Sequence, residues 1–84
     1  MENRIEVVRM SRLDGDGSVK AFCDISFFDT LIIKGLRIVN GKNGLFVSLP
    51  REQGKDGKWY DTVQLLNREV KKVVEDTVLT AFSA

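Results

Sequence analysis

Hydrophobic and polar positions alternate along the first half of the chain with the two-residue period of β-strands. Residues 19–28 alternate most clearly, with polar side chains on one face and small or apolar ones on the other: Val19, Ala21, Cys23, Ile25 and Phe27. Similar patterns predict strands over residues 4–13, 31–39 and 45–49, and a brief fifth strand over residues 59–63.

Short segments rich in Asp, Asn and Gly separate the first four strands. Residues 14–17 (Asp-Gly-Asp-Gly) and residues 40–44, with two Asn-Gly pairs, predict turns because these residue types adopt positive φ values readily. Pro50 is expected to end the fourth strand, and residues 51–58 are interpreted as a mobile polar loop. The neighbouring valines of the first strand predict a bulge or burial on both faces, and Gly35 of the third strand predicts a bulge or a close approach of another backbone.

The period changes near the C-terminus to that of an amphipathic helix. Apolar or small side chains recur at the spacing of one helical face: Val70, Val73, Val74, Thr77, Val78, Ala81 and Phe82. Asn67 is the expected N-cap. Strands followed by one helix predict an α+β fold, an antiparallel β-sheet of four to five strands with one C-terminal amphipathic helix, in a single domain over residues 1–84.

The composition excludes several classes of function. The 84 residues include no histidine and one cysteine, so the common zinc sites, Ser-His and Cys-His catalysis and an intrachain disulfide are all ruled out. No phosphate-binding loop occurs, and residues 14–17 lack the downstream ligands of a calcium loop. We therefore expect no enzyme, no metal or other cofactor, and no small-molecule substrate.

The cysteine and the N-terminus bear on location. Cys23 lies in a strand pattern where a small buried side chain fits, so we interpret it as a structural thiol, and a lone cysteine suits a reducing compartment. The N-terminus shows no signal-peptide core, and no run approaches the ~20 apolar residues of a membrane span. A cytoplasmic protein is expected, with no membrane association.

The charge is uneven along the chain although its net value is only +1. Between Lys34 and Lys58 there are six cations against two anions, which gives this window a charge of +4. Such a patch could meet a phosphate backbone, or its members could be solvated loop tips. The cations of residues 51–60 adjoin Trp59 and Tyr60, which could stack on nucleic-acid bases or, alternatively, anchor the helix.

The segment of residues 36–50 (LRIVNGKNGLFVSLP) resembles the SpoVG family, the stage V sporulation protein G or septation regulators of bacteria. The family pattern is of the type Arg-x-x-x-Gly-x-x-Gly-Leu-Phe-Val-x-Met-Pro. Leu49 replaces the methionine, and the other positions match: Arg37, Gly41, Gly44, Leu45, Phe46, Val47 and Pro50. The length, the opening strand, the Gly57–Asp61 stretch and the C-terminal helix are also similar, so the resemblance covers nearly the whole chain.

This resemblance implies a homodimer that binds DNA and RNA in gene regulation linked to cell division, septation and sporulation. The chain departs from the family at residues 51–53, where a serine and a basic pair are usual, and at residues 63–65, where His-Pro is usual. We predict phosphate contacts from cations of the polar loop and the helix: Arg51, Lys55, Lys58, Arg68, Lys71 and Lys72. The alternative is a non-enzymatic protein-interaction module that acts in septation without direct nucleic-acid binding.

Two further expectations concern packing. Residues 31–39 and 45–49 present more apolar strand surface than one short helix can cover, which also predicts a homodimer. Phe46 is expected in the core, where truncation to alanine would cost about 3–5 kcal/mol.

Overall fold

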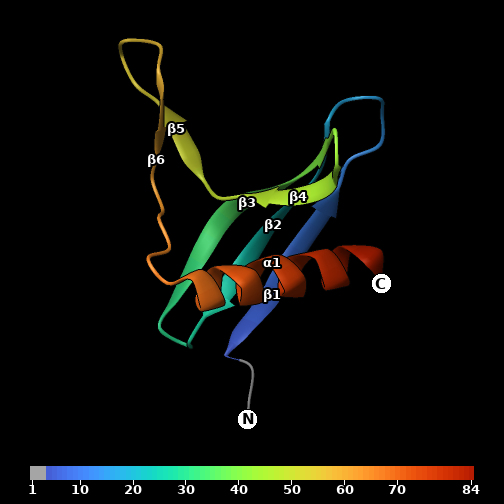
Figure 1. The fold of residues 1–84 in the computed structure, drawn as a ribbon, viewed down its shortest axis with the longest axis vertical. Coiled ribbons are helices and arrows are strands. Elements are labelled where there is room, and N and C mark those ends of the chain that lie inside the picture. Colours follow the sequence, from blue (N-terminus) through green and yellow to red (C-terminus); the bar gives the residue numbers. More distant parts are fainter. Residues whose placement is uncertain (1–3) are drawn as a thin grey trace.

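A four-stranded antiparallel sheet forms most of the molecule. The computed structural model describes residues 4–84. Residues 1–3 belong to the expected domain and to the N-terminal segment in which no signal-peptide core was expected, and they lie outside the described part. The strands β1 (Ile5–Arg12), β2 (Val19–Phe27), β3 (Leu31–Gly41) and β4 (Gly44–Ser48) are neighbours in that order (Figure 1). Each lies within two residues of its predicted bounds, and the predicted α+β fold class is confirmed.

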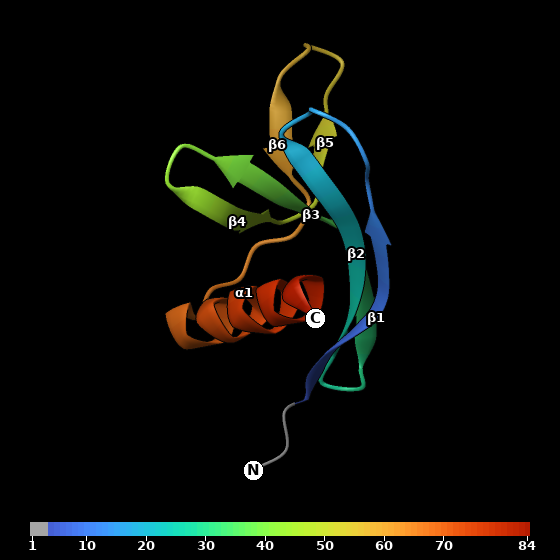
Figure 2. The ribbon, with the colours of Figure 1, turned by 90° about the vertical axis from the view of Figure 1, so that its right-hand side faces the viewer.

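The helix α1 (Arg68–Ser83) crosses one face of this sheet, as Figure 2 shows from the side. Asn67 is its N-cap, and Oδ1 accepts hydrogen bonds from Glu69 N at 2.8 Å and Val70 N at 3.2 Å. The buried stripe is narrower than predicted because Val73 remains 40% exposed. The core between helix and sheet consists of small and branched residues: Ile5, Ala21, Cys23, Ile25, Ile33, Leu36, Ile38, Val74 and Val78.

Two bulges occur where the sequence predicts them. The β1–β2 register shifts between Val7 and Arg9, which leaves Val8 as the extra residue. The β2–β3 register shifts between Cys23 and Ile25, opposite a segment in which Gly35 has a φ of +83°. Bulges bend strands and increase their twist. The β3–β4 end of the sheet accordingly bends toward the helix side (Figure 2).

The segment predicted as a mobile loop is instead a second small sheet. β5 (Arg51–Gln53) and β6 (Trp59–Asp61) pair antiparallel, and Gly54 N donates to Lys58 O at 2.8 Å across the turn. β5 consists of three polar residues, so it shows no alternation of hydrophobic and polar positions. The sequence pattern therefore did not predict β5. The hairpin rises away from the helix, as does the loop of residues 13–18, and β3 and β4 lie between these two arms (Figure 1).

The prediction that Phe46 is buried was wrong. β4 pairs with β3 so that Val47 lies opposite Ile38, a core residue that faces the helix. Successive side chains of a strand point to opposite faces, so Phe46 points away from the helix. Its side chain is 46% exposed.

Candidate nucleic-acid interface

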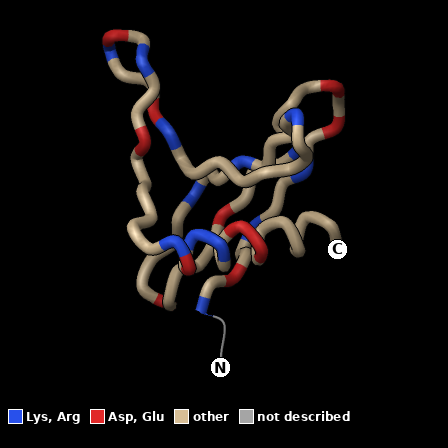
Figure 3. Tube along the Cα trace, in the orientation of Figure 1, with Lys and Arg blue, Asp and Glu red and all other residues tan. Residues whose placement is uncertain are grey.

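The six predicted phosphate-contacting residues fall into two exposed groups. Arg51, Lys55 and Lys58 lie on the β5–β6 hairpin, and we call them the hairpin group. Arg68, Lys71 and Lys72 lie in the first two turns of α1 and form the helix group. Figure 3 shows both groups on the same side of the molecule, joined by the chain between β6 and α1.

One cavity of about 720 Å³ connects the two groups. Arg51 lines it from the base of the hairpin, and Lys71 lines it from the helix. The remaining wall comes from β4 and the residue after it, from the end of β6 and from the linker between β6 and α1: Phe46, Val47, Ser48, Leu49, Asp61, Val63, Gln64, Leu65 and Leu66. The structure therefore brings together two predicted residues that are distant in sequence.

The hairpin has no net charge, since its three cations are matched by three anions: Glu52, Asp56 and Asp61. Arg51 Nε lies 3.2 Å from Asp61 Oδ1, and both side chains are about half exposed. Within residues 4–84, no ion pair engages Lys55 or Lys58. These two lysines are therefore more available to an external anion than Arg51 is.

A hydrogen-bonded pair shapes the tip of the hairpin. Asp56 Oδ2 accepts a hydrogen bond from Tyr60 Oη at 2.5 Å, and Asp56 Oδ1 accepts one from Lys58 N at 3.0 Å. The hydrogen bond from Tyr60 lowers the pKa of Asp56 most, and the hydrogen bond from Lys58 N lowers it further. The Tyr60–Asp56 hydrogen bond also raises the pKa of Tyr60. Asp56 is therefore ionised at neutral pH, and its carboxylate is hydrogen-bonded to Tyr60 and to the backbone of Lys58.

The helix group is divided between two directions. Lys71 and Lys72 are about 100° apart around the helix axis, and only Lys71 lines the cavity. The first-turn N–H groups of Glu69 and Val70 bond to Asn67, so they are not free for a phosphate. Lys71 is thus the member of this group that lines the cavity together with Arg51 of the hairpin group.

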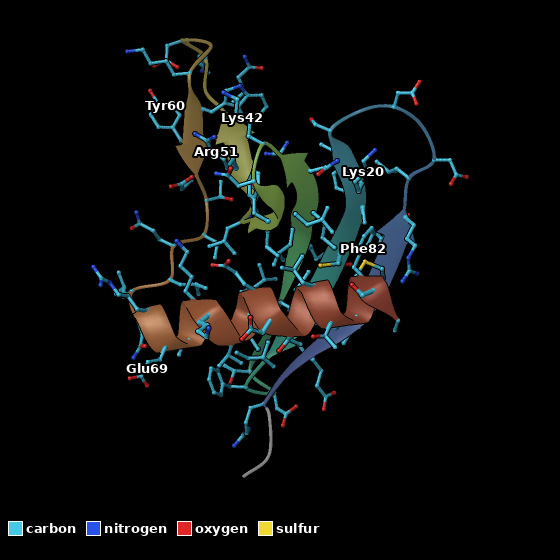
Figure 4. All side chains as sticks on the ribbon, turned by 45° about the vertical axis from the view of Figure 1, so that its right-hand side comes forward. Lys20, Lys42, Arg51, Tyr60, Glu69 and Phe82 are labelled. Carbon is cyan, nitrogen blue, oxygen red and sulfur yellow. The ribbon has the colours of Figure 1, made fainter. Side chains whose placement is uncertain are left out.

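The two aromatic residues of the hairpin do not anchor the helix, so that alternative was wrong. Trp59 is 52% exposed, and Tyr60 is similarly exposed, on an arm directed away from α1 (Figure 1). Strand alternation places Trp59 on the hairpin face of Arg51 and Asp61, whereas Tyr60 lies on the opposite face (Figure 4). Of the two hairpin aromatic residues, Trp59 is therefore the one that shares a hairpin face with the cavity-lining Arg51 and Asp61.

The cysteine and the acidic side chains are the other groups that could carry chemistry. Cys23 is fully buried, and desolvation, followed by the nearby Asp24 charge, raises its pKa to about 11. Within residues 4–84, no three His, Cys, Asp or Glu side chains gather as potential metal ligands. The helix α1 is neither long nor apolar enough to cross a membrane.

Comparisons with known proteins find the same family that the segment of residues 36–50 resembles. The chain is 40% identical over 78 residues to the SpoVG protein of Archaeoglobus fulgidus, covering 93% of this chain and 92% of that one. It is 38% identical over 81 residues to SpoVG of Symbiobacterium thermophilum, and this match spans 96% of the chain but only 58% of the relative. The SpoVG protein of Clostridioides difficile is 30% identical over 79 residues, covering 94% and 86% of the two chains.

The names of these relatives link them with septation. The family model described as SpoVG matches residues 3–84, which include the sheet, the hairpin and the helix. The chain belongs to the SpoVG family.

Proposed function

We propose that the protein is a cytoplasmic, non-enzymatic regulator that binds DNA and RNA through the hairpin and helix groups. The observation that supports this function best is the cavity lined by both Arg51 and Lys71. A nucleic-acid backbone that crossed this cavity would reach cations from two separate elements. Two such anchoring points fix the direction of a strand, which one flexible loop could not do.

The electrostatics favour weak individual contacts that add together. Lys55, Lys58, Arg68 and Lys71 are exposed and belong to no ion pair of the described residues, so a phosphate need not displace a carboxylate. Each contact releases condensed counterions, which is the main source of affinity in such interfaces. Arg51 would have to exchange Asp61 for phosphate or bridge both groups. We therefore assign the larger share of binding to the unpaired cations.

The names of the relatives connect this family with septation, and we propose the same process for this chain. Regulation of septation and of sporulation-type gene expression by nucleic-acid binding would need no catalytic group.

We also propose that the protein acts as a homodimer. β4 is an edge strand of the larger sheet, so one side of its backbone has no partner strand among residues 4–84 of a single copy. Leu45 at the start of this strand is exposed, and Leu66 beside the same cavity is 94% exposed. Pairing of two β4 edges would satisfy the backbone and cover apolar surface on both copies.

A protein-interaction module is the second candidate, because a linker leucine as exposed as Leu66 is typical of a surface that a protein partner covers. The two functions differ in their dependence on salt. Binding through Leu66 and its apolar neighbours would change little with ionic strength, whereas binding through lysines and arginines would weaken steeply.

Matched substitutions of adjacent lysines test the nucleic-acid proposal. Lys71→Ala should weaken binding to DNA and RNA probes of every sequence and reduce the log–log salt slope by about one unit. Lys72→Ala removes the same charge from a side chain that does not line the cavity, and it should reduce the affinity and the salt slope by less. Equal effects of the two substitutions would show that only net charge matters and would refute the proposed site.

A further inference from the structure

The sheet face that points away from the helix carries aromatic and basic side chains near β4. The strand register places Ser11, Phe22, Arg37 and Ser48 in one row across all four strands. Val39 and Phe46 are paired in the next row. We call these six residues the open face.

The open face has an excess of positive charge. None of its six residues is acidic, and within residues 4–84 Arg37 takes part in no ion pair. Lys20, in β2, and Lys42, in the β3–β4 turn, border it (Figure 4). The acidic neighbour in the adjoining row, Asp24, is paired with Arg9 at 3.1 Å. This charge favours an anionic ligand over an apolar protein surface.

The ring of Phe46 is supported from one side and exposed on the other. A Cβ atom on Gly41 would lie 2.8 Å from Cε1 and 3.3 Å from Cδ1 of this ring. The absence of a side chain at Gly41 therefore lets the ring lie close over the β3 backbone. Although it is held there, Phe46 keeps 46% of its surface exposed.

Two projecting segments flank the ribbon that carries Phe46. The β5–β6 hairpin and the loop of residues 13–18 rise on the two sides of the β3–β4 ribbon (Figure 1). A strand lying between these arms would pass from the open face to the hairpin group. The aromatic ring and the cations would then follow one path.

We propose that the open face binds an unpaired stretch of nucleic acid, with Phe46 stacking on a base and Arg37 contacting an adjoining phosphate. This inference rests on the proposed function and extends its site across the sheet, since Phe46 and Ser48 of the open face also line the cavity. Antiparallel sheets with exposed aromatic residues opposite a helical layer bind splayed bases in this way. A base held inside a duplex cannot lie on the sheet, so the open face selects single strands.

Substitution of two exposed phenylalanines provides a matched test. Phe46→Leu keeps an apolar side chain on the strand but removes the ring, and it should weaken single-stranded DNA and RNA binding about 5- to 150-fold. Duplex binding should weaken much less, because the cations that contact phosphates are untouched and a paired base cannot stack on the ring. Phe46→Tyr should retain single-strand affinity. Phe28→Leu makes the same change at the β2–β3 turn, outside the open face, and should have no effect on either probe.

Each outcome of these measurements decides the proposal. A much larger loss for single strands than for duplexes in Phe46→Leu, with retained affinity in Phe46→Tyr, supports it. Unchanged single-strand binding by Phe46→Leu, while the wild type binds, would overturn the open-face site alone. Wild type that binds neither strand form would overturn the proposed function as well. A change of mass in light scattering on Phe46→Leu would assign the ring to an interface between copies instead.

Discussion

Asp24 accepts a hydrogen bond from the backbone of Gly35, with its Oδ1 atom 3.0 Å from the glycine nitrogen. The other carboxylate oxygen, Oδ2, accepts from Arg9 Nε at 3.1 Å. Asp24 lies in β2, and its two partners lie in β3 and β1 at the bulged positions. One buried side chain thus bonds to both neighbouring strands where the bulges interrupt the regular ladder.

The two bonds of Asp24 should contribute unequally to stability. Asp24→Ala leaves the Gly35 N–H without its acceptor, so we expect a loss of about 1–3 kcal/mol in the free energy of unfolding. Asp24→Asn can still accept from Gly35 and loses mainly the ion pair with the largely exposed Arg9, a loss of about 0–1 kcal/mol. Thermal melts measure both, at about 4–8 °C per kcal/mol for a chain of this size. Equal shifts for the two variants would contradict this account.

Arg12 should stabilise the C-terminal end of the helix from outside. Its Nη2 atom donates to the carbonyl oxygens of Phe82 at 2.7 Å and Ala81 at 3.2 Å, and its guanidinium lies 5.5 Å from the centre of the Phe82 ring. The last turn of α1 contains no basic residue of its own. We expect Arg12→Ala to cost about 1–2 kcal/mol in urea unfolding. Arg12→Lys keeps the positive charge and should lower the free energy of unfolding by less than Arg12→Ala does. A loss as large as that of Arg12→Ala would show that the charge of Arg12 does not stabilise the helix end.

Cys23 should make stability depend on pH in the alkaline range. Its pKa rises from 9.0 to about 11 in the folded chain, so the unfolded chain releases the thiol proton first as pH increases. The stabilisation is complete below pH 9 and is lost between about pH 9 and pH 11. Cys23→Ala should flatten this part of the stability curve. A thiol reagent should modify native Cys23 only on unfolding, and rapid modification of the native chain would contradict its burial.

Several parts of the fold were predictable because one local signal dominated each. Alternation along β2 identified Ala21, Cys23 and Ile25 as core residues, and the side-chain oxygen of Asn67 marked the start of α1. The continuous apolar run of β4 was ambiguous, since neighbours on both faces are apolar. Only pairing of Val47 with Ile38 decides that Phe46 points outward.

The candidate site was predictable in residue type but not in arrangement. Charge counting identified Arg51 and Lys71, yet the cavity that joins them depends on the path of the linker after β6. The contact of Arg12 with the helix end could not be predicted from the sequence either, because it connects residues about 70 positions apart.

The conformation of the Phe28–Asp29 turn was also not predictable. Both residues have φ values of +54°, and the turn lacks the glycine that usually signals such a conformation.

The most direct test of the central claim is the salt dependence of nucleic-acid binding by the wild-type protein. Fluorescence anisotropy with labelled DNA and RNA probes, between about 50 and 200 mM salt, gives the association constant at each concentration. Each phosphate contact on duplex DNA contributes about 0.9 to the log–log slope, so the four unpaired cations predict a slope of about 3 to 4 per copy. Steep, linear weakening with salt is the predicted result. Absence of binding at the lowest salt, or affinity that does not change with salt, would contradict the electrostatic interface.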